Sequence, residues 1–149
     1  MMSRSPLFLV AAAVLTLSAG LGSAETVGPS GVWLTQAGDA KIKISPCGPG
    51  LCGTVVWLKV AIDPATGKPQ VDDKNSNPAL AHRPIVGIDI FKGMKAVADR
   101  KWSGRIYNAD DGKTYSSDVT LAAPHKLEVR GCVMGILCGG ETWTKVAGL

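Results

Sequence analysis

The cysteines are the residues of this sequence most able to carry chemistry, because a thiolate can bind a metal, exchange disulfides or attack a substrate. The four of them are Cys47, Cys52, Cys132 and Cys138. Their spacings are C-x4-C and C-x5-C, unlike the C-x-x-C of thiol oxidoreductases or the C-x2-C pairs typical of zinc sites. The two histidines, His82 and His125, have no fixed spacing to the cysteines. The pattern therefore favours disulfides over a metal or redox centre.

Four cysteines can be paired in three ways, and the sequence alone leaves the choice open. We favour Cys47 with Cys52 and Cys132 with Cys138, because each pair flanks a glycine-containing turn between two expected strands. Such bonds persist in oxidising compartments. In the chain-entropy description, closing so short a loop stabilises the fold by about 2 kcal/mol.

A run of acidic and amide residues gives a second candidate for chemistry. Residues 73–77 have the D-x-N-x-N start of a calcium loop, but the later positions that need glycine and glutamate hold Pro78 and Pro84. Aspartate and asparagine commonly hydrogen-bond their own backbone in turns. We therefore expect turn and cap roles here, and no metal or other cofactor.

Catalysis would require an activated nucleophile or a pair of groups for acid and base work. The sequence contains neither G-x-S-x-G nor H-E-x-x-H. The adjacent acids Asp72 and Asp73, like Asp110 and Asp111, fall in turns, where we expect exposure rather than the burial that raises a carboxyl pKa. These observations predict that the protein is not an enzyme.

Aromatic and arginine side chains could instead line the mouth of a binding pocket. The candidate binding residues are Trp57, Arg83, Arg105, Tyr107 and Tyr115. Aromatic residues are enriched in strands for packing reasons alone, and we favour core and cross-strand packing for most of them. If a cavity exists, a few polar groups in an apolar lining would suit a small amphipathic molecule.

The first 24 residues have the layout of a secretory signal peptide: Arg4, an apolar run over residues 7–21, and small residues up to Ala24. We expect cleavage there and a single domain over residues 25–149, exported to the periplasm or secreted. No cysteine precedes Cys47, so we expect no lipid anchor. A membrane span needs about 20 mostly apolar residues, and the small residues that end the apolar run favour cleavage, so we expect no membrane span. Without Arg4 the 16 basic residues become 15, against 12 acidic ones, and they are scattered, which disfavours a nucleic-acid partner.

Short segments of strand-like pattern cover most of the remaining chain. Residues 40–45 alternate strictly, and Asp111-Gly112 is a strong hairpin signal. The expected strands are residues 31–36, 40–45, 51–60, 85–91, 101–108, 113–121, 126–133 and 138–146. Residues 92–100 fit a loop or a short helix equally well. Residues 61–84 are predicted to be a long loop with one helical turn capped by Asn77.

Eight antiparallel strands in a chain of this size must close or sandwich to protect their edges. We predict an all-β fold, a small up-and-down barrel of about eight strands, with a β-sandwich as the alternative. Such a barrel has an interior wide enough for side chains or one modest ligand.

A glycine-x-tryptophan motif at Gly31 and Trp33 opens the first expected strand, and Trp143 and Lys145 share a face of the last. This resembles the calycin arrangement, in which the first-strand tryptophan closes one end of the barrel beneath a basic side chain from the final strand. The indole plugs the barrel while the cation lies over its ring. Where the resemblance leads us to expect arginine, this chain has Lys145, which weakens any bidentate or stacked contact.

Longer stretches resemble the bacterial exported family called domain of unknown function 2147. They are "GVWLT", "CGPGLCGTVVWLK", "DKNSNPALAHRPIVGI", "WSGRIYNADDGKTYSSDVTL" and "LEVRGCVMGILCGGETWTKV". The resemblance implies a periplasmic or secreted lipocalin-like barrel, and it brings no substrate or catalytic residue. We expect a binding module for a small apolar or amphipathic ligand, or an envelope-associated role. The alternative is a protein-interaction, inhibitor or assembly module that uses the loop 61–84.

Overall fold

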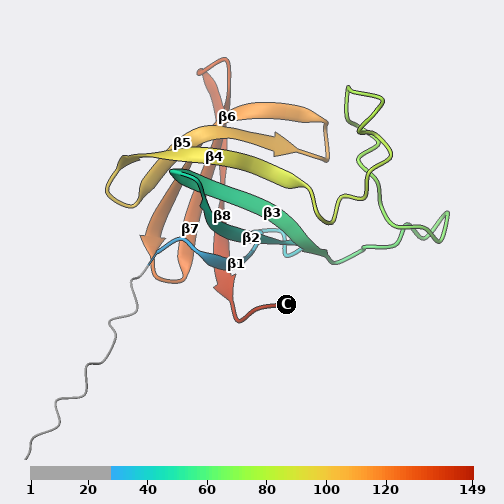
Figure 1. The fold of residues 1–149 in the computed structure, drawn as a ribbon, viewed down its shortest axis with the longest axis horizontal. Coiled ribbons are helices and arrows are strands. Elements are labelled where there is room, and N and C mark those ends of the chain that lie inside the picture. Colours follow the sequence, from blue (N-terminus) through green and yellow to red (C-terminus); the bar gives the residue numbers. More distant parts are fainter. Residues whose placement is uncertain (1–27) are drawn as a thin grey trace, which may run out of the picture.

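Eight antiparallel strands form one closed barrel in the computed structural model, which describes residues 28–149. Each strand pairs with the next, and the first pairs with the last (Figure 1). The strands are β1 (Gly31–Leu34), β2 (Ala40–Cys47), β3 (Gly50–Leu58), β4 (Asp89–Ala98), β5 (Lys101–Asn108), β6 (Lys113–Ala123), β7 (Lys126–Val133) and β8 (Leu137–Val146). The predicted up-and-down barrel is confirmed, and the sandwich alternative is wrong.

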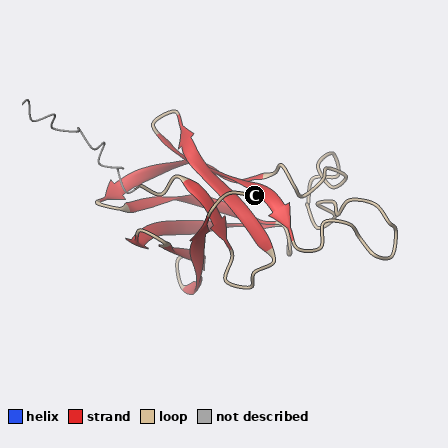
Figure 2. Ribbon diagram, turned by 90° about the horizontal axis from the view of Figure 1, so that it is seen from below, coloured by secondary structure: helices blue, strands red, loops and turns tan. Residues whose placement is uncertain are grey.

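The described residues contain strands, turns and loops but no helix (Figure 2). None of residues 28–149 therefore forms a helix with the length and apolar character of a membrane span. The predicted signal peptide, residues 1–24, lies outside the described residues.

In β2, apolar and charged residues alternate strictly, so one face of the strand contributes to the barrel core and the other faces solvent. Ile42 and Ile44 are 2% and 1% exposed, whereas Lys43 between them faces outward. Strands β6 and β7 alternate in the same way and bring Val119, Leu121 and Leu127 into the interior. Because one face of each of these three strands is buried, this pattern fixes their pairing register.

Trp33 packs inside the end of the barrel at which the described chain begins. The side chain is fully buried, and its indole N–H donates a hydrogen bond to the carbonyl of Pro29 at 2.8 Å. Lys145, its register partner on β8, holds its ammonium 5.5 Å from the centre of the ring. A Cβ atom on Gly31 would lie 2.6 Å from Cε of Lys145. The glycine of the motif therefore leaves room for the lysine to reach across the tryptophan.

A β-bulge in β3 changes which side chains face inward. Ile42 pairs with Val55 but Lys41 pairs with Trp57, so Val56 is the extra residue. After the bulge Leu58 lines the interior, and Trp57 lies on the outer face, 5.2 Å from the ammonium of Lys41. An added residue of this kind shifts the alternation by one position.

Strand β4 differs from the sequence-based prediction. Residues 85–88 were expected to be strand but form a turn, in which the Ile88 N–H donates to the Ile85 carbonyl at 3.1 Å. Residues 92–98, for which a loop or a helix was considered, instead continue β4. In this half only Met94 is buried, so the local sequence shows no alternation, and pairing with β5 determines the strand.

The two disulfides join Cys47 to Cys52 and Cys132 to Cys138. The first lies at the β2–β3 turn, and the second bridges directly opposed residues of β7 and β8. These are the two pairs that the sequence favours, and no cysteine among the described residues is free.

The connection from β3 to β4 is a long loop, residues 59–88, which projects from the barrel in Figure 1. At Asn77 the side-chain oxygen accepts the Ala79 N–H at 3.0 Å, and the carbonyl accepts the Ala81 N–H at 3.2 Å. The predicted capped turn is present, but it does not extend into a helix.

Candidate functional site

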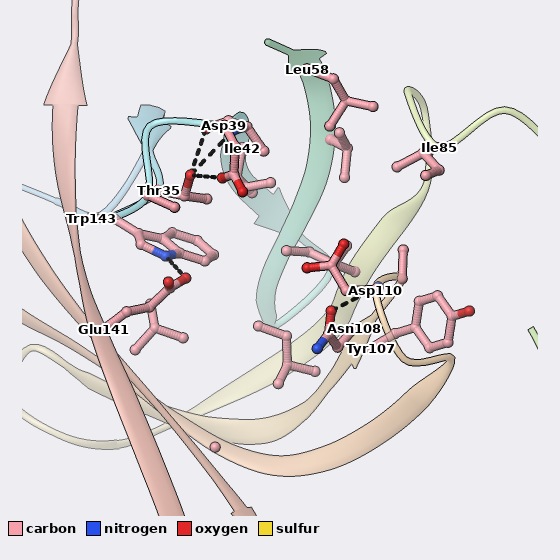
Figure 3. A pocket seen from close by; sticks show the side chains of 18 of the residues that line it. Thr35, Asp39, Ile42, Leu58, Ile85, Tyr107, Asn108, Asp110, Glu141 and Trp143 are labelled. Carbon is pink, nitrogen blue, oxygen red and sulfur yellow. Dashed lines mark hydrogen bonds between the residues drawn. The ribbon is translucent and has the colours of Figure 1, made fainter. Parts of the chain in front are cut away.

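A cavity of about 630 Å³ opens at the end of the barrel opposite Trp33. Its wall is formed by the β1–β2 turn, the end of β3, part of the long loop, the β5–β6 turn and the first half of β8 (Figure 3). In an up-and-down barrel, the connections that lead from an odd-numbered strand to the next strand all lie at the same end. The β1–β2, β3–β4 and β5–β6 connections therefore meet around the opening of the cavity.

The deep part of the cavity is apolar. Trp143 is 2% exposed and lies beneath the opening, with Ile42, Val55, Ile90 and Val129 around it. Higher in the wall, two residues of the inner face have no side chains, namely Gly131 and Gly139. The cavity exists partly because β7 and β8 place these glycines where a side chain would otherwise fill the barrel.

Polar groups gather nearer the opening. The hydroxyl of Thr35 donates to the Asp39 carboxylate at 2.6 Å, and the side-chain oxygen of Asn108 accepts the Asp110 N–H at 3.0 Å. Below them, the indole N–H of Trp143 donates to the Glu141 carboxylate (Figure 3). An apolar chamber with a few polar groups is the usual form of a small-molecule site.

The long loop is tied to the barrel by one buried carboxylate, Asp72. It is fully buried and accepts hydrogen bonds from the Tyr107 hydroxyl at 2.6 Å and the Asn75 amide at 2.8 Å. Arg83 donates to it from Nε at 2.9 Å and forms an ion pair with it at 2.8 Å. Because Tyr107 belongs to β5, this cluster fixes the loop to the rim of the cavity.

A close backbone contact supports the same attachment. Gly112, in the β5–β6 turn, has a φ of +70°, and a Cβ atom there would lie 1.8 Å from the carbonyl oxygen of Lys74. A glycine therefore allows the turn and the loop to touch.

Both tyrosines near the opening have raised pKa values. Burial and the hydrogen bond to Asp72 raise the pKa of Tyr107, although Asn75 and Arg83 oppose this. The hydrogen bond to Asp111 raises the pKa of Tyr115 and lowers that of Asp111. On the outer wall, hydrogen bonds from Ser103 and Lys101 lower the pKa of Asp118.

These shifts predict how the protein responds to alkaline pH. The chain has two tyrosines, and both phenols are favoured in their neutral form by the fold. That stabilisation is fully present below the unfolded pKa of about 10 and is lost as pH rises through the folded values. We expect the phenolate absorbance of the native protein to rise at higher pH than that of the urea-unfolded chain. In the Tyr107→Phe variant, the remaining phenolate signal comes from Tyr115 alone. If the titration curves of the native and unfolded proteins coincide, the raised pKa values are wrong.

The five binding candidates from the sequence do not form one site. Tyr107 and Tyr115 line the cavity, although the Tyr107 hydroxyl points away from it toward the loop (Figure 3). Trp57 lies on the outer face because of the bulge in β3. Arg105 is exposed beside Ser116 on β6, and Arg83 forms an ion pair with Asp72. The cavity lining therefore does not include Trp57, Arg83 or Arg105.

The residues 73–77 act through turn chemistry. Asn75 bonds to Asp72 and to the Asn77 N–H, while Asp73 is exposed and pairs only with Lys74, at 3.3 Å. Residues 28–149 contain no group of three or more histidine, cysteine, aspartate or glutamate side chains placed to bind a metal ion.

Two important side chains were missed or misjudged from the sequence. Asp72 was expected to be exposed but is fully buried, because its partners Arg83 and Tyr107 come from distant segments. Glu141 was not considered at all. The signal that could have identified it is its position two residues before Trp143, which places both on the inner face of one strand.

Comparison with known proteins agrees with this architecture. A family model described as an uncharacterized protein conserved in bacteria, domain of unknown function 2147, matches residues 31–145. The chain belongs to this family. The match runs from the glycine of the first-strand motif to the lysine of β8, so the family sequence pattern includes both strands that close the barrel.

A solved structure has the same fold. Protein HP1028 from Helicobacter pylori, described as belonging to the lipocalin family, aligns with a TM-score of 0.66 and 22% identity. The alignment covers 79% of this chain and 82% of that one. No curated protein sequence matches the chain. The fold of this member of the family is therefore lipocalin-like.

Proposed function

We propose that this protein binds a small apolar or amphipathic molecule in the cavity at the open end of the barrel. The observation that carries the proposal is the cavity itself, with about 630 Å³ of space above an apolar floor that includes Trp143. Cavities of small-molecule sites typically measure about 300 to 1,000 Å³ and combine apolar walls with a few polar groups.

A binding role without catalysis suits the residues around this cavity better than an enzymatic one. The residues that line it include neither histidine nor cysteine, and the Thr35 hydroxyl donates to the carboxylate of Asp39, which is exposed and a weak base. Nucleophilic catalysis needs a nucleophile paired with a base strong enough to activate it. The proposal requires no cofactor.

We also propose that the protein is exported, to the periplasm or beyond. Support comes from the two disulfides, because such bonds persist in oxidising compartments, and from the signal-like sequence of residues 1–24. Mass spectrometry of the protein from its native cells would find a chain that begins at Glu25 and has no free thiol.

The alternative role for the long loop, docking a protein partner, receives less support. Gln70 and Ile85 of this loop line the cavity, and Asp72 fixes the loop to the rim. The loop therefore helps to shape the binding site.

Tryptophan fluorescence tests the proposal, since Trp143 forms the cavity floor. We expect dodecyl amphiphiles, added below their micelle-forming concentration, to change the emission saturably. Gly131→Phe should weaken this binding by at least about tenfold, because the new ring would project into the cavity from a position where a Cβ atom meets only Tyr115, at 3.6 Å.

The matched control is Ser116→Phe, which adds the same ring on the outer face of β6, outside the cavity lining. It should bind as the parent protein does. If every amphiphile leaves the emission unchanged, or if the two phenylalanine variants behave alike, the proposed function is wrong.

A further inference from the structure

The charges that line the cavity are mostly negative. Three carboxylates contribute to its wall, those of Asp39, Asp110 and Glu141, against one ammonium, that of Lys59. Asp39, Asp110 and Lys59 are exposed at the opening, where water weakens their fields. Glu141 is half-buried and lies on β8 within the barrel wall, so a bound molecule would meet its charge most directly.

The position of Glu141 is set by its own strand. Alternation along β8 places Glu141 and Trp143 on the inner face, and the indole N–H of Trp143 donates to Oε1 of the carboxylate. Figure 3 shows the carboxylate beside the indole, within the group of side chains that line the cavity. This single hydrogen bond leaves most of the acceptor capacity of the carboxylate unused.

No cation of the described chain neutralises this carboxylate. The ion pairs of residues 28–149 involve Asp72, Asp73, Asp118 and Glu128, and none involves Glu141. Its neighbours on the inner face, Gly139 on β8 and Gly131 on β7, have no side chains to shield it. A carboxylate beside an apolar chamber favours a positive or hydrogen-bond-donating partner and repels another carboxylate.

We propose that the cavity selects single-chain amphiphiles with a protonated amine as the polar group, and that Glu141 is the residue that recognises the amine. This inference rests on the proposed function and names the class of ligand. The alkyl chain occupies the apolar floor over Trp143, and the ammonium group lies against the Glu141 carboxylate. An alkyl carboxylate of the same length would place two negative charges together.

Three probes with the same chain test the selection: dodecylamine, dodecanol and dodecanoate, titrated at neutral pH below their micelle-forming concentrations. For unit charges about 5 Å apart near a protein surface, the Coulomb attraction alone corresponds to about 300-fold, and the hydration that the ammonium loses on binding lowers the expected preference to about 10- to 100-fold. We expect dodecylamine to bind most tightly, dodecanol less tightly and dodecanoate least. The amine-to-alcohol ratio in the parent protein is itself a test, independent of any variant.

Glu141→Gln should bring the three affinities together, because glutamine keeps an acceptor for the Trp143 N–H but has no charge. Thermal unfolding would verify that the variant is folded. The matched control is Glu128→Gln, which removes the same charge from the exposed side of the adjacent strand β7, where Glu128 pairs with Lys126 at 3.4 Å. This control should retain the full preference for the amine.

The outcomes separate the two proposals. If dodecanol binds in the cavity but dodecylamine binds no better, the inference about Glu141 is wrong while the binding function stands. If Glu128→Gln reduces the amine preference as much as Glu141→Gln does, general surface charge explains it and the inference is again wrong. If none of the three probes binds, the proposed function itself fails.

Discussion

Replacing Asp72 with alanine is expected to release the long loop from the barrel at a cost of about 3 kcal/mol. The substitution removes the acceptor shared by Tyr107, Asn75 and Arg83. Arg83 is partly exposed, so water can solvate the guanidinium, and the expected value lies at the lower end of the range for broken buried pairs. The barrel itself should remain folded, because its strands do not depend on this cluster.

Amide hydrogen exchange would measure the release. In the parent protein the Asp72 N–H donates to the Arg83 carbonyl and the Ile85 N–H to the Gln70 carbonyl, both at 3.0 Å. Both amides should exchange much faster in Asp72→Ala, while amides of β6 and β7 keep their protection. The control is Asp73→Ala, which removes an adjacent, exposed carboxylate. Equal exchange in the two variants would show that Asp72 does not hold the loop.

Replacing Trp33 with alanine should lower the free energy of unfolding by about 4 kcal/mol. The indole is fully buried at the closed end, donates to Pro29 and lies under Lys145. Removing it leaves a large void and an unpaired carbonyl. Since domains of this size are typically stable by about 5 to 15 kcal/mol, the variant should lose a large part of its free energy of unfolding.

Urea unfolding followed by circular dichroism would measure this loss without depending on tryptophan emission. Trp57→Ala is the matched control, because it removes the same side chain from the outer face, where Trp57 stacks with Lys41. We expect the control to lose about 1 kcal/mol. A loss at Trp33 no larger than at Trp57 would mean that the closed end does not depend on the indole.

The parts of this fold that could be predicted are those set by local sequence. Strand β2 alternates lysine and isoleucine, and the strands β5 and β7 begin and end at the residues expected from the sequence. Failures occur where pairing decides the outcome. The second half of β4 buries only Met94, so its sequence lacks the alternation of a strand. The bulge in β3 depends on the register with β2, so the sequence around Trp57 could not show that this side chain faces outward.

The candidate site was harder to predict than the fold because its parts are distant in sequence. Asp72 lies in a polar loop whose composition indicates exposure, and its burial depends on Tyr107, on a strand 35 positions later. The cavity depends on what is absent from the inner face of the wall, namely side chains at Gly131 and Gly139. Local patterns predict where side chains point, but the space left between them depends on every strand at once.

The seam between β1 and β8 has a consequence for how the molecule assembles. Seven of the pairings join consecutive strands, but this one joins Val32–Leu34 to residues 144–146 near the far end of the chain. Loop-closure entropy makes such a distant contact slow to form. A sheet of the other pairings would have no enclosed interior until this short seam forms. We therefore expect the barrel to enclose its interior only after residues 144–146 have been synthesised and have paired with β1.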